Sequence, residues 1–137
     1  GYCADISRTF VCGNDFNNTQ KELYSMSLEQ INHNSNLIKA DMSFKEFTEK
    51  SWKLPEEYYG NRYSVMVHGI GLCDEWPSIR YPTDGGDKSG RFLKNMTITV
   101  ESYIGKVGGK EGVKLEDEYL ITDNGLELLS SYPLDKV

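Results

Sequence analysis

Two stretches of the chain carry apolar residues at helical spacing behind a capping-box pattern. The first follows Thr19-Gln20-Lys21-Glu22 and predicts a helix over about residues 19–39. Its apolar positions are Tyr24, Leu28, Ile31 and Ile38, with Leu23 and Leu37 beside them. The second follows Ser43-Phe44-Lys45-Glu46 and predicts a shorter helix that ends near Pro55. Each helix therefore has an apolar face to pack on another layer, while His33, among asparagines, is expected to face solvent.

Alternating or β-branched composition predicts strands in most of the remaining chain. The expected strands span residues 2–11, 63–68, 96–104, 113–122 and 126–129. Gly13-Asn14-Asp15 ends the first of them, Asp123-Asn124-Gly125 is a hairpin-type turn, and residues 78–94 have an irregular pattern. The order of one strand, two helices and then antiparallel strands is typical of an α+β fold.

Composition and charge exclude several classes of protein function. The chain has 137 residues, enough for one domain with a real core, and its 38% apolar and 26% charged residues are ordinary for a globular protein. The net charge of −6 argues against a nucleic-acid or anionic-membrane surface. No apolar run approaches the roughly 18–20 residues of a transmembrane helix. Three cysteines without a CxxC motif fit reduced thiols, so a cytoplasmic location is expected.

The densest group of chemically active residues lies in residues 67–77, which contain His68, Asp74, Glu75 and Trp76. A histidine followed by Gly-x-Gly at a strand end suits a ring that faces a ligand while the backbone packs closely behind it. An alternative is a histidine satisfied within the core. The interpretation of His68 as a ligand-binding residue is favoured because carboxylates also occur in the other predicted strands.

Asp5, Glu101 and Glu116 each lie within a predicted strand. A carboxylate in an otherwise apolar strand is costly to bury unless it is paired or bound to a cation. Together with His68, these carboxylates form a ligand set for a divalent transition metal, with Mn or Fe favoured by the oxygen-rich composition and Co or Zn compatible. The alternative is that Glu101 and Glu116 face solvent on half-buried strands.

Several segments resemble the pita-bread-fold metalloenzymes, a family that includes methionine aminopeptidase, aminopeptidase P, prolidase and creatinase. The matching segments are Gly1–Phe10, His68–Leu72, Met96–Glu101, Gly112–Asp117 and Leu120–Gly125, and they occur in family order over nearly the whole chain. The resemblance implies the C-terminal half of such a catalytic domain, so residues 1–137 are expected to be a single partial domain, with an antiparallel sheet and two helices.

The resemblance also implies roles for individual residues. Asp5 and Glu116 are expected to bridge two metal ions, and His68 and Glu101 to complete the ligands of one of them. One further metal-binding Asp of the family falls upstream of the position matched by Asp5, before this chain begins. One or two divalent metal ions are therefore expected in the parent protein, whereas this chain alone is expected to be inactive.

The segment after the glycine turn bears on the reaction. Peptidases of the family carry a second histidine there, in a segment like His-Glu-x-Pro, but this chain reads Asp74-Glu75-Trp76-Pro77. A carboxylate can only accept a hydrogen bond, whereas the histidine of the peptidases would donate one to the negative charge that develops on the tetrahedral intermediate. The segment is instead similar to the branch with the dimethylsulfoniopropionate lyases, which implies Asp74 as the general base. Trp76 or Tyr81 is then a candidate to bind a substrate sulfonium.

Three functions follow from these observations, in order of preference. The first is lyase-like β-elimination with Asp74 as base, the second is Xaa-Pro dipeptidase or aminopeptidase hydrolysis, and the third is a non-catalytic pita-bread binding module. The expected partners are a small-molecule or dipeptide substrate and a second copy of the chain in a homodimer, because half of a fold leaves apolar surface exposed.

Overall fold

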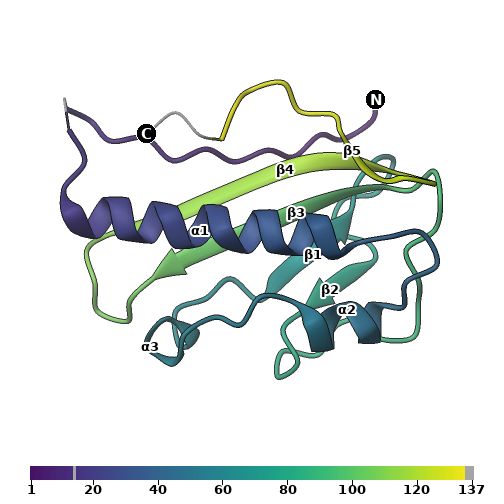
Figure 1. Cartoon of the computed structure of the whole chain (residues 1–137), viewed down its shortest axis with the longest axis horizontal. Helices are drawn as coiled ribbons and strands as arrows, with labels where there is room; N and C mark the ends of the chain where they lie inside the picture. Colours follow the sequence, from purple (N-terminus) through teal and green to yellow (C-terminus); the bar gives the residue numbers. More distant parts are fainter. Residues whose placement is uncertain (14, 135–137) are drawn as a thin grey trace.

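Five antiparallel strands form one sheet in the computed structural model of the chain, which describes residues 1–13 and 15–134 (Figure 1). The strands are β1 (Val65–Gly69), β2 (Ser78–Arg80), β3 (Thr97–Gly105), β4 (Gly112–Thr122) and β5 (Gly125–Leu128). They lie in the order β2-β1-β3-β4-β5. The predicted α+β class and the antiparallel sheet are confirmed, and β2 is an addition within the segment predicted to be irregular.

The long helix α1 (Asn18–Leu37) lies across β3 and β4, as Figure 1 shows. Its ends fall within two residues of the predicted ones, but its N-cap is Asn17 rather than Thr19. The Asn17 side chain accepts from the Gln20 backbone N–H at 2.9 Å, and the Gln20 side chain accepts from the Asn17 N–H at 2.9 Å. The predicted capping box was therefore wrong by two residues, because Asn17-x-x-Gln20 satisfies the same pattern.

Two shorter helices follow, α2 (Phe44–Lys50) and α3 (Glu56–Tyr59). The predicted cap of α2 is confirmed, since Ser43 Oγ accepts from the Glu46 N–H at 3.1 Å. The helix ends at Lys50, earlier than the predicted end near Pro55, and α3 was not predicted. In the part of the chain that the structure describes, no helix is long and apolar enough to cross a membrane.

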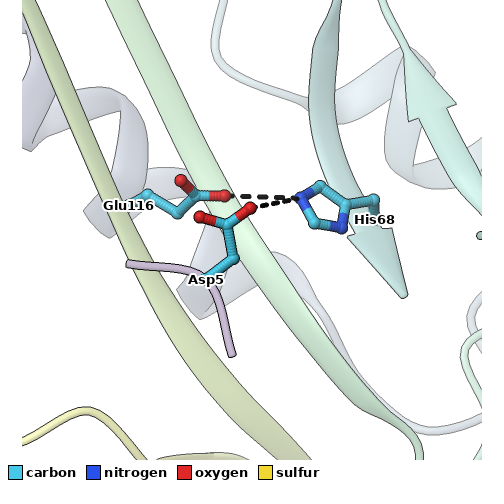
Figure 2. A group of neighbouring side chains, drawn as sticks. All are labelled: Asp5, His68 and Glu116. Carbon is cyan, nitrogen blue, oxygen red and sulfur yellow. Dashed lines mark ion pairs between the residues drawn. The ribbon is translucent and has the colours of Figure 1, made fainter. Parts of the chain in front are cut away.

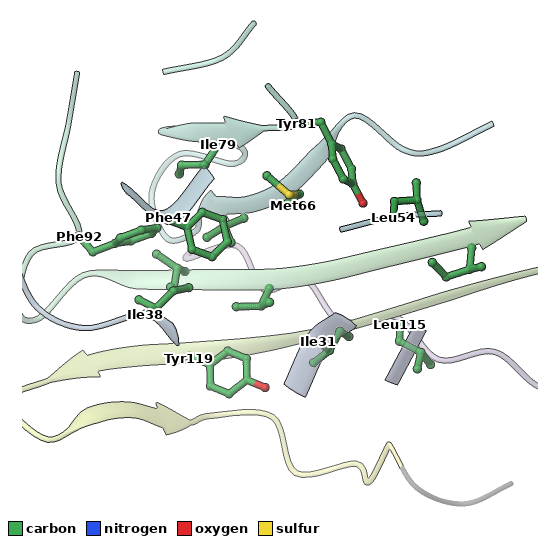
Figure 3. Packing of buried hydrophobic residues seen from close by; sticks show 14 of the residues in the cluster. Ile31, Ile38, Phe47, Leu54, Met66, Ile79, Tyr81, Phe92, Leu115 and Tyr119 are labelled. Atoms are coloured by element: carbon green, nitrogen blue, oxygen red, sulfur yellow. The ribbon is translucent and has the colours of Figure 1, made fainter. Parts of the chain in front are cut away.

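The core lies between the helices and one face of the sheet (Figure 3). On this face the strands present apolar residues, and α1 presents Ile31, which is fully buried. The strand residues are Val67 from β1, Ile98, Val100 and Ile104 from β3, and Leu115 and Ile121 from β4. Phe92 joins α2 to this layer through edge-on contacts with Phe44 and Phe47, at ring-centroid distances of 4.8 and 5.6 Å. This arrangement leaves the opposite face of β1, β3 and β4 for polar side chains.

The N-terminal segment, residues 1–12, was predicted to contain a strand over 2–11, and this was wrong. It runs alongside β4 with a single bridge, in which Ser7 and Glu116 exchange both backbone hydrogen bonds at 3.2 and 3.1 Å. Strand composition is present, but one pair of backbone bonds does not make a strand. The predicted turn at residues 13–15 includes Asn14, which lies outside the described residues.

Candidate metal centre

Register in the sheet brings together three of the predicted metal ligands. His68 in β1 is opposite Thr99 in β3, and Glu101 in β3 is directly opposite Glu116 in β4. Because side chains alternate along a strand, Thr99 and Glu101 share one face, and their cross-strand partners share it too. His68, Glu101 and Glu116 therefore lie on the face of the sheet away from α1, and all three are buried.

Asp5 reaches the same place from the N-terminal segment, as Figure 2 shows. From His68 Nε2 the carboxylate oxygens lie at 3.3 Å for Glu116 Oε1, 3.8 Å for Glu101 Oε1 and 3.9 Å for Asp5 Oδ2. One ligand atom from each of Asp5, His68 and Glu116 lies within 4.8 Å of the other two. Asp5, His68 and Glu116 thus form one cluster of potential ligand atoms, whereas Glu101 approaches His68 Nε2 but lies outside that cluster.

Two local features aim the His68 ring at the carboxylates. Nδ1 lies 3.0 Å from the backbone carbonyl oxygen of Gly69, and since a carbonyl only accepts, Nδ1 carries the hydrogen. The Nε2 lone pair of the neutral ring is then directed toward the carboxylates. Gly69 itself is required because a Cβ there would collide with the carbonyl oxygen of Trp76. The glycine after the histidine therefore permits the close packing that the sequence predicted.

The carboxylates fit a cation. Among the described residues, Glu101 Oε1 and Glu116 Oε1 are buried side-chain oxygens without a hydrogen bond, and both face His68. Buried polar atoms normally have a hydrogen-bond partner, so two buried carboxylate oxygens without one are suited to bind a cation. The other oxygen of each glutamate is occupied: Lys114 Nζ pairs with Glu101 Oε2, and Ser7 Oγ donates to Glu116 Oε2 at 2.9 Å.

Neighbouring groups shift the pKa of His68. Burial alone lowers this pKa, because the charged ring loses hydration. Interactions with Glu116, the Gly69 carbonyl and Glu101 outweigh burial and raise the pKa of the ring to about 9. The neighbouring carboxylates therefore stabilise the protonated form of the His68 ring.

The carboxylates respond differently to the same surroundings. Burial raises the pKa of Glu101 to about 7, although the ammonium of Lys114 opposes it. Burial and the charge of Glu116 raise the pKa of Asp5. Burial acts against ionisation of Glu116 as well, but His68 and Lys114 together hold its pKa below the usual range. The cluster is thus a set of closely spaced carboxylates that titrate together with the cationic groups of His68 and Lys114.

The predicted catalytic and substrate residues lie outside the metal ligands. Asp74 is half exposed in the loop after β1, with Oδ1 3.9 Å from His68 Nδ1, on the other side of the ring from the carboxylates. Trp76 is exposed and lines a cavity with Gly69. The structure does not bring Tyr81 to this cluster: it is buried in the core, where its hydroxyl accepts from Gln30 at 2.5 Å.

Sequence reasoning missed two residues of the cluster, Lys114 and Ser7. Both follow from strand parity, since Lys114 precedes Glu116 by two residues on β4 and Ser7 follows Asp5 by two along the extended N-terminal segment. The signal was present, but lysine and serine at these positions are also typical of a solvent-facing strand.

Comparison with known proteins assigns the family. The model of metallopeptidase family M24 matches residues 1–123, so the chain belongs to this family. It is 38% identical over 139 residues to the dimethylsulfoniopropionate lyase DddP of Roseovarius nubinhibens, covering 98% of this chain and 31% of that protein. It is 37% identical to the Xaa-Pro dipeptidase of Pyrococcus furiosus, covering 94% of this chain and 36% of that protein.

Solved structures agree on the fold. The prolidase from Pyrococcus horikoshii OT3 matches 99% of this chain and 38% of its own, with a TM-score of 0.79 and 28% identity. Zn-substituted Escherichia coli aminopeptidase P matches with a TM-score of 0.72 at 23% identity, a likeness of fold alone. The pita-bread fold expected from the sequence motifs is confirmed, and the chain spans about a third of the length of the relatives that it matches.

Proposed function

We propose that the chain supplies ligands for a divalent metal ion, and the general base, in an enzyme that eliminates a sulfonium group from a small carboxylate, as a dimethylsulfoniopropionate lyase does. The observation that carries the proposal is the 38% identity to DddP over 98% of this chain. The metal ligands would be Asp5, His68, Glu101 and Glu116, with Mn, Fe or Co as candidate ions and Zn compatible.

A divalent ion held there would supply Lewis-acid stabilisation of negative charge on the substrate carboxylate. Asp74 removes the proton from the carbon next to that carboxylate. The freed electron pair forms a double bond to the neighbouring carbon, whose bond to sulfur breaks with its pair retained by sulfur. The products are dimethyl sulfide, acrylate and protonated Asp74, which returns its proton to water. Trp76 is the candidate to face the sulfonium cation, since an exposed indole attracts cations.

A second candidate function is Xaa-Pro dipeptide hydrolysis, which the 37% identity to the Pyrococcus furiosus dipeptidase favours. The sequence of the loop after β1 argues against dipeptide hydrolysis. Asp74-Glu75-Trp76-Pro77 contains no histidine to donate to the oxyanion of a tetrahedral intermediate. A non-catalytic binding module is the third candidate, and the four intact ligand positions weigh against it.

Paired assays distinguish these candidates. Dimethyl sulfide release and Xaa-Pro cleavage are measured with added Mn²⁺, on this chain and on the chain extended upstream to the length of its relatives. The lyase proposal expects sulfide release that falls by about 100-fold or more in Asp74→Asn, given the usual contribution of a general base. Dipeptide cleavage that survives Asp74→Asn would instead establish the peptidase. Metal binding without either activity would leave the binding module.

We further propose that the chain forms a homodimer in the cytoplasm. Tyr2, Ile6 and Phe10 on the N-terminal segment are exposed, and their even spacing places them on one side of an extended backbone. An apolar row of this kind favours association. Sedimentation of a monomer over the micromolar range would exclude the homodimer.

A further inference from the structure

The ammonium of Lys114 contacts both glutamates of the proposed metal centre. Its Nζ pairs with Glu101 Oε2 and lies 3.5 Å from Glu116 Oε2. The proposed function assigns it no part. The contacts divide the four glutamate oxygens into two pairs: the Oε2 atoms meet Lys114, whereas the Oε1 atoms face His68 and accept no hydrogen bond among the described residues. One ammonium thus binds the Oε2 atom of each glutamate and leaves the two Oε1 atoms available for a second cation.

The sheet makes such a cation necessary. Glu101 and Glu116 are directly opposite on neighbouring strands, and like charges at opposite positions repel each other. Both side chains are almost fully buried, at 2% and 1% exposed, so water screens this repulsion poorly. An ammonium shared by both carboxylates offsets the repulsion, and it also fixes the rotation of each carboxylate about its last bond.

Lys114 is itself held in place. Its backbone N–H donates to Thr9 Oγ1 at 2.9 Å, and the Thr9 hydroxyl donates back to the Lys114 carbonyl at 2.7 Å. The ammonium lies over the ring of Tyr63, 4.5 Å from its centroid. These contacts fix both ends of a side chain that would otherwise have many rotamers, so the position of the ammonium is set in advance of any ligand.

We propose that Lys114 is a positioning residue for the metal centre. Its ammonium anchors Glu101 Oε2 and Glu116 Oε2 and so presents the two Oε1 atoms to a divalent cation beside His68. A metal ion then binds without displacing the lysine, because the two cations use different oxygens. This inference rests on the proposed metal-dependent function.

The test is the Mn²⁺ affinity of the whole chain, measured by isothermal titration calorimetry for the original chain and for Lys114→Met. Outer hydrogen-bond partners of metal ligands are typically worth about 10–100-fold in affinity, so Lys114→Met is expected to bind Mn²⁺ about 10–100-fold more weakly. Lys114→Arg keeps a cation with several donors and is expected to restore most of the affinity. Lys110→Met, at an exposed lysine, makes the same change in net charge and is expected to bind like the original chain.

Different results would reject the positioning role of Lys114 and the metal-dependent function. Equal or tighter binding by folded Lys114→Met would overturn the positioning role, since the lysine would then only repel the metal. Equal weakening in Lys110→Met would overturn it too, because net charge alone would explain the loss. Circular dichroism checks folding. If Lys114→Met does not fold, the Mn²⁺ affinity of Lys114→Gln is measured instead, and equal or tighter binding would again overturn the positioning role. Failure of both the original chain and the chain extended upstream to bind Mn²⁺ would overturn the metal-dependent function and this inference together.

Discussion

The two faces of the sheet are built from the same strands but bury different kinds of side chain. The face beneath α1 holds mainly aliphatic side chains, with Ser102 hydrogen-bonded to Gln30 and Ser27 of the helix, whereas the opposite face holds His68 and the carboxylates of the proposed metal centre. Both faces are buried where β3 and β4 pair. The apolar face gains stability from burial. The polar face buries two carboxylate oxygens that accept no hydrogen bond from the described residues, at a cost to folding that a bound cation would offset.

Residues that stabilise the core and residues of the proposed metal centre therefore alternate along one strand. In β3, Ile98 and Val100 face the helix and Glu101 faces the proposed metal centre. A substitution on one face should therefore change one property and spare the other. The variants below test whether the two faces are as independent as their geometry suggests.

The largest effect is expected at the polar face. Glu101→Gln keeps the shape of the side chain but replaces the carboxylate Oε1 that faces His68. We expect Mn²⁺ affinity to fall by more than the roughly 100-fold upper figure for an outer partner, because a ligand itself is lost. Stability of the metal-free chain at pH 8 should stay the same or rise, since burial already disfavours the charged form and raises the pKa of Glu101 to about 7. Calorimetry and urea unfolding measure the two quantities.

The matched change on the apolar face is Ile98→Ala. Ile98 is fully buried under the helix layer, and truncating such a residue typically costs about 2–5 kcal/mol of unfolding free energy. Mn²⁺ affinity of the fraction that stays folded should be unchanged. Urea unfolding gives the first quantity and calorimetry the second. A loss of affinity as large as that of Glu101→Gln would show that packing on the apolar face controls metal binding on the polar face.

The pH dependence of stability should also separate the faces. The pKa of His68 is raised to about 9 in the folded chain, from an ordinary value of 6.5. A raised pKa means that the folded state holds the proton more tightly, so this contribution is complete below pH 6.5 and is lost as pH rises through about 9. Metal-free protein should therefore lose stability between pH 6.5 and 9. His68→Gln should remove the part of this loss above about pH 8, while the raised pKa of Glu101, about 7, still lowers stability up to near pH 7. Ile98→Ala should lower the whole curve and keep its shape, as urea unfolding at several pH values would reveal.

The sequence predicted the fold where a pattern was long enough to repeat. Helix α1 and strands β3 and β4 have several periods of their hydrophobic pattern, so their type and approximate ends were predictable. Strand β2 has three residues, too few to show alternation. The N-terminal segment has strand composition, but pairing depends on what lies beside it, and it makes one bridge with β4.

The site was predictable in its residue types and not in its assembly. Alternation placed Glu101 on the polar face, and the cost of burying a carboxylate suggested a cation. That Asp5 lies beside Glu116 depends on a contact between the two ends of the chain, which only the resemblance to a known family supplied. Lys114 was missed because a lysine on a strand usually faces solvent, and its contact with Glu101 appears only once the strands are in register.

The smallest effect concerns the helix that covers the apolar face, where the predicted and observed caps differ. Asn17→Ala removes the oxygen that accepts from the Gln20 N–H and should cost about 1 kcal/mol of unfolding free energy. Thr19→Ala is the control: Thr19 is exposed within the first turn and alanine favours helix, so stability should stay the same or rise slightly. Urea unfolding of both variants measures these changes, and the Mn²⁺ affinity of both should be that of the original chain. A larger loss in Thr19→Ala than in Asn17→Ala would return the cap to Thr19.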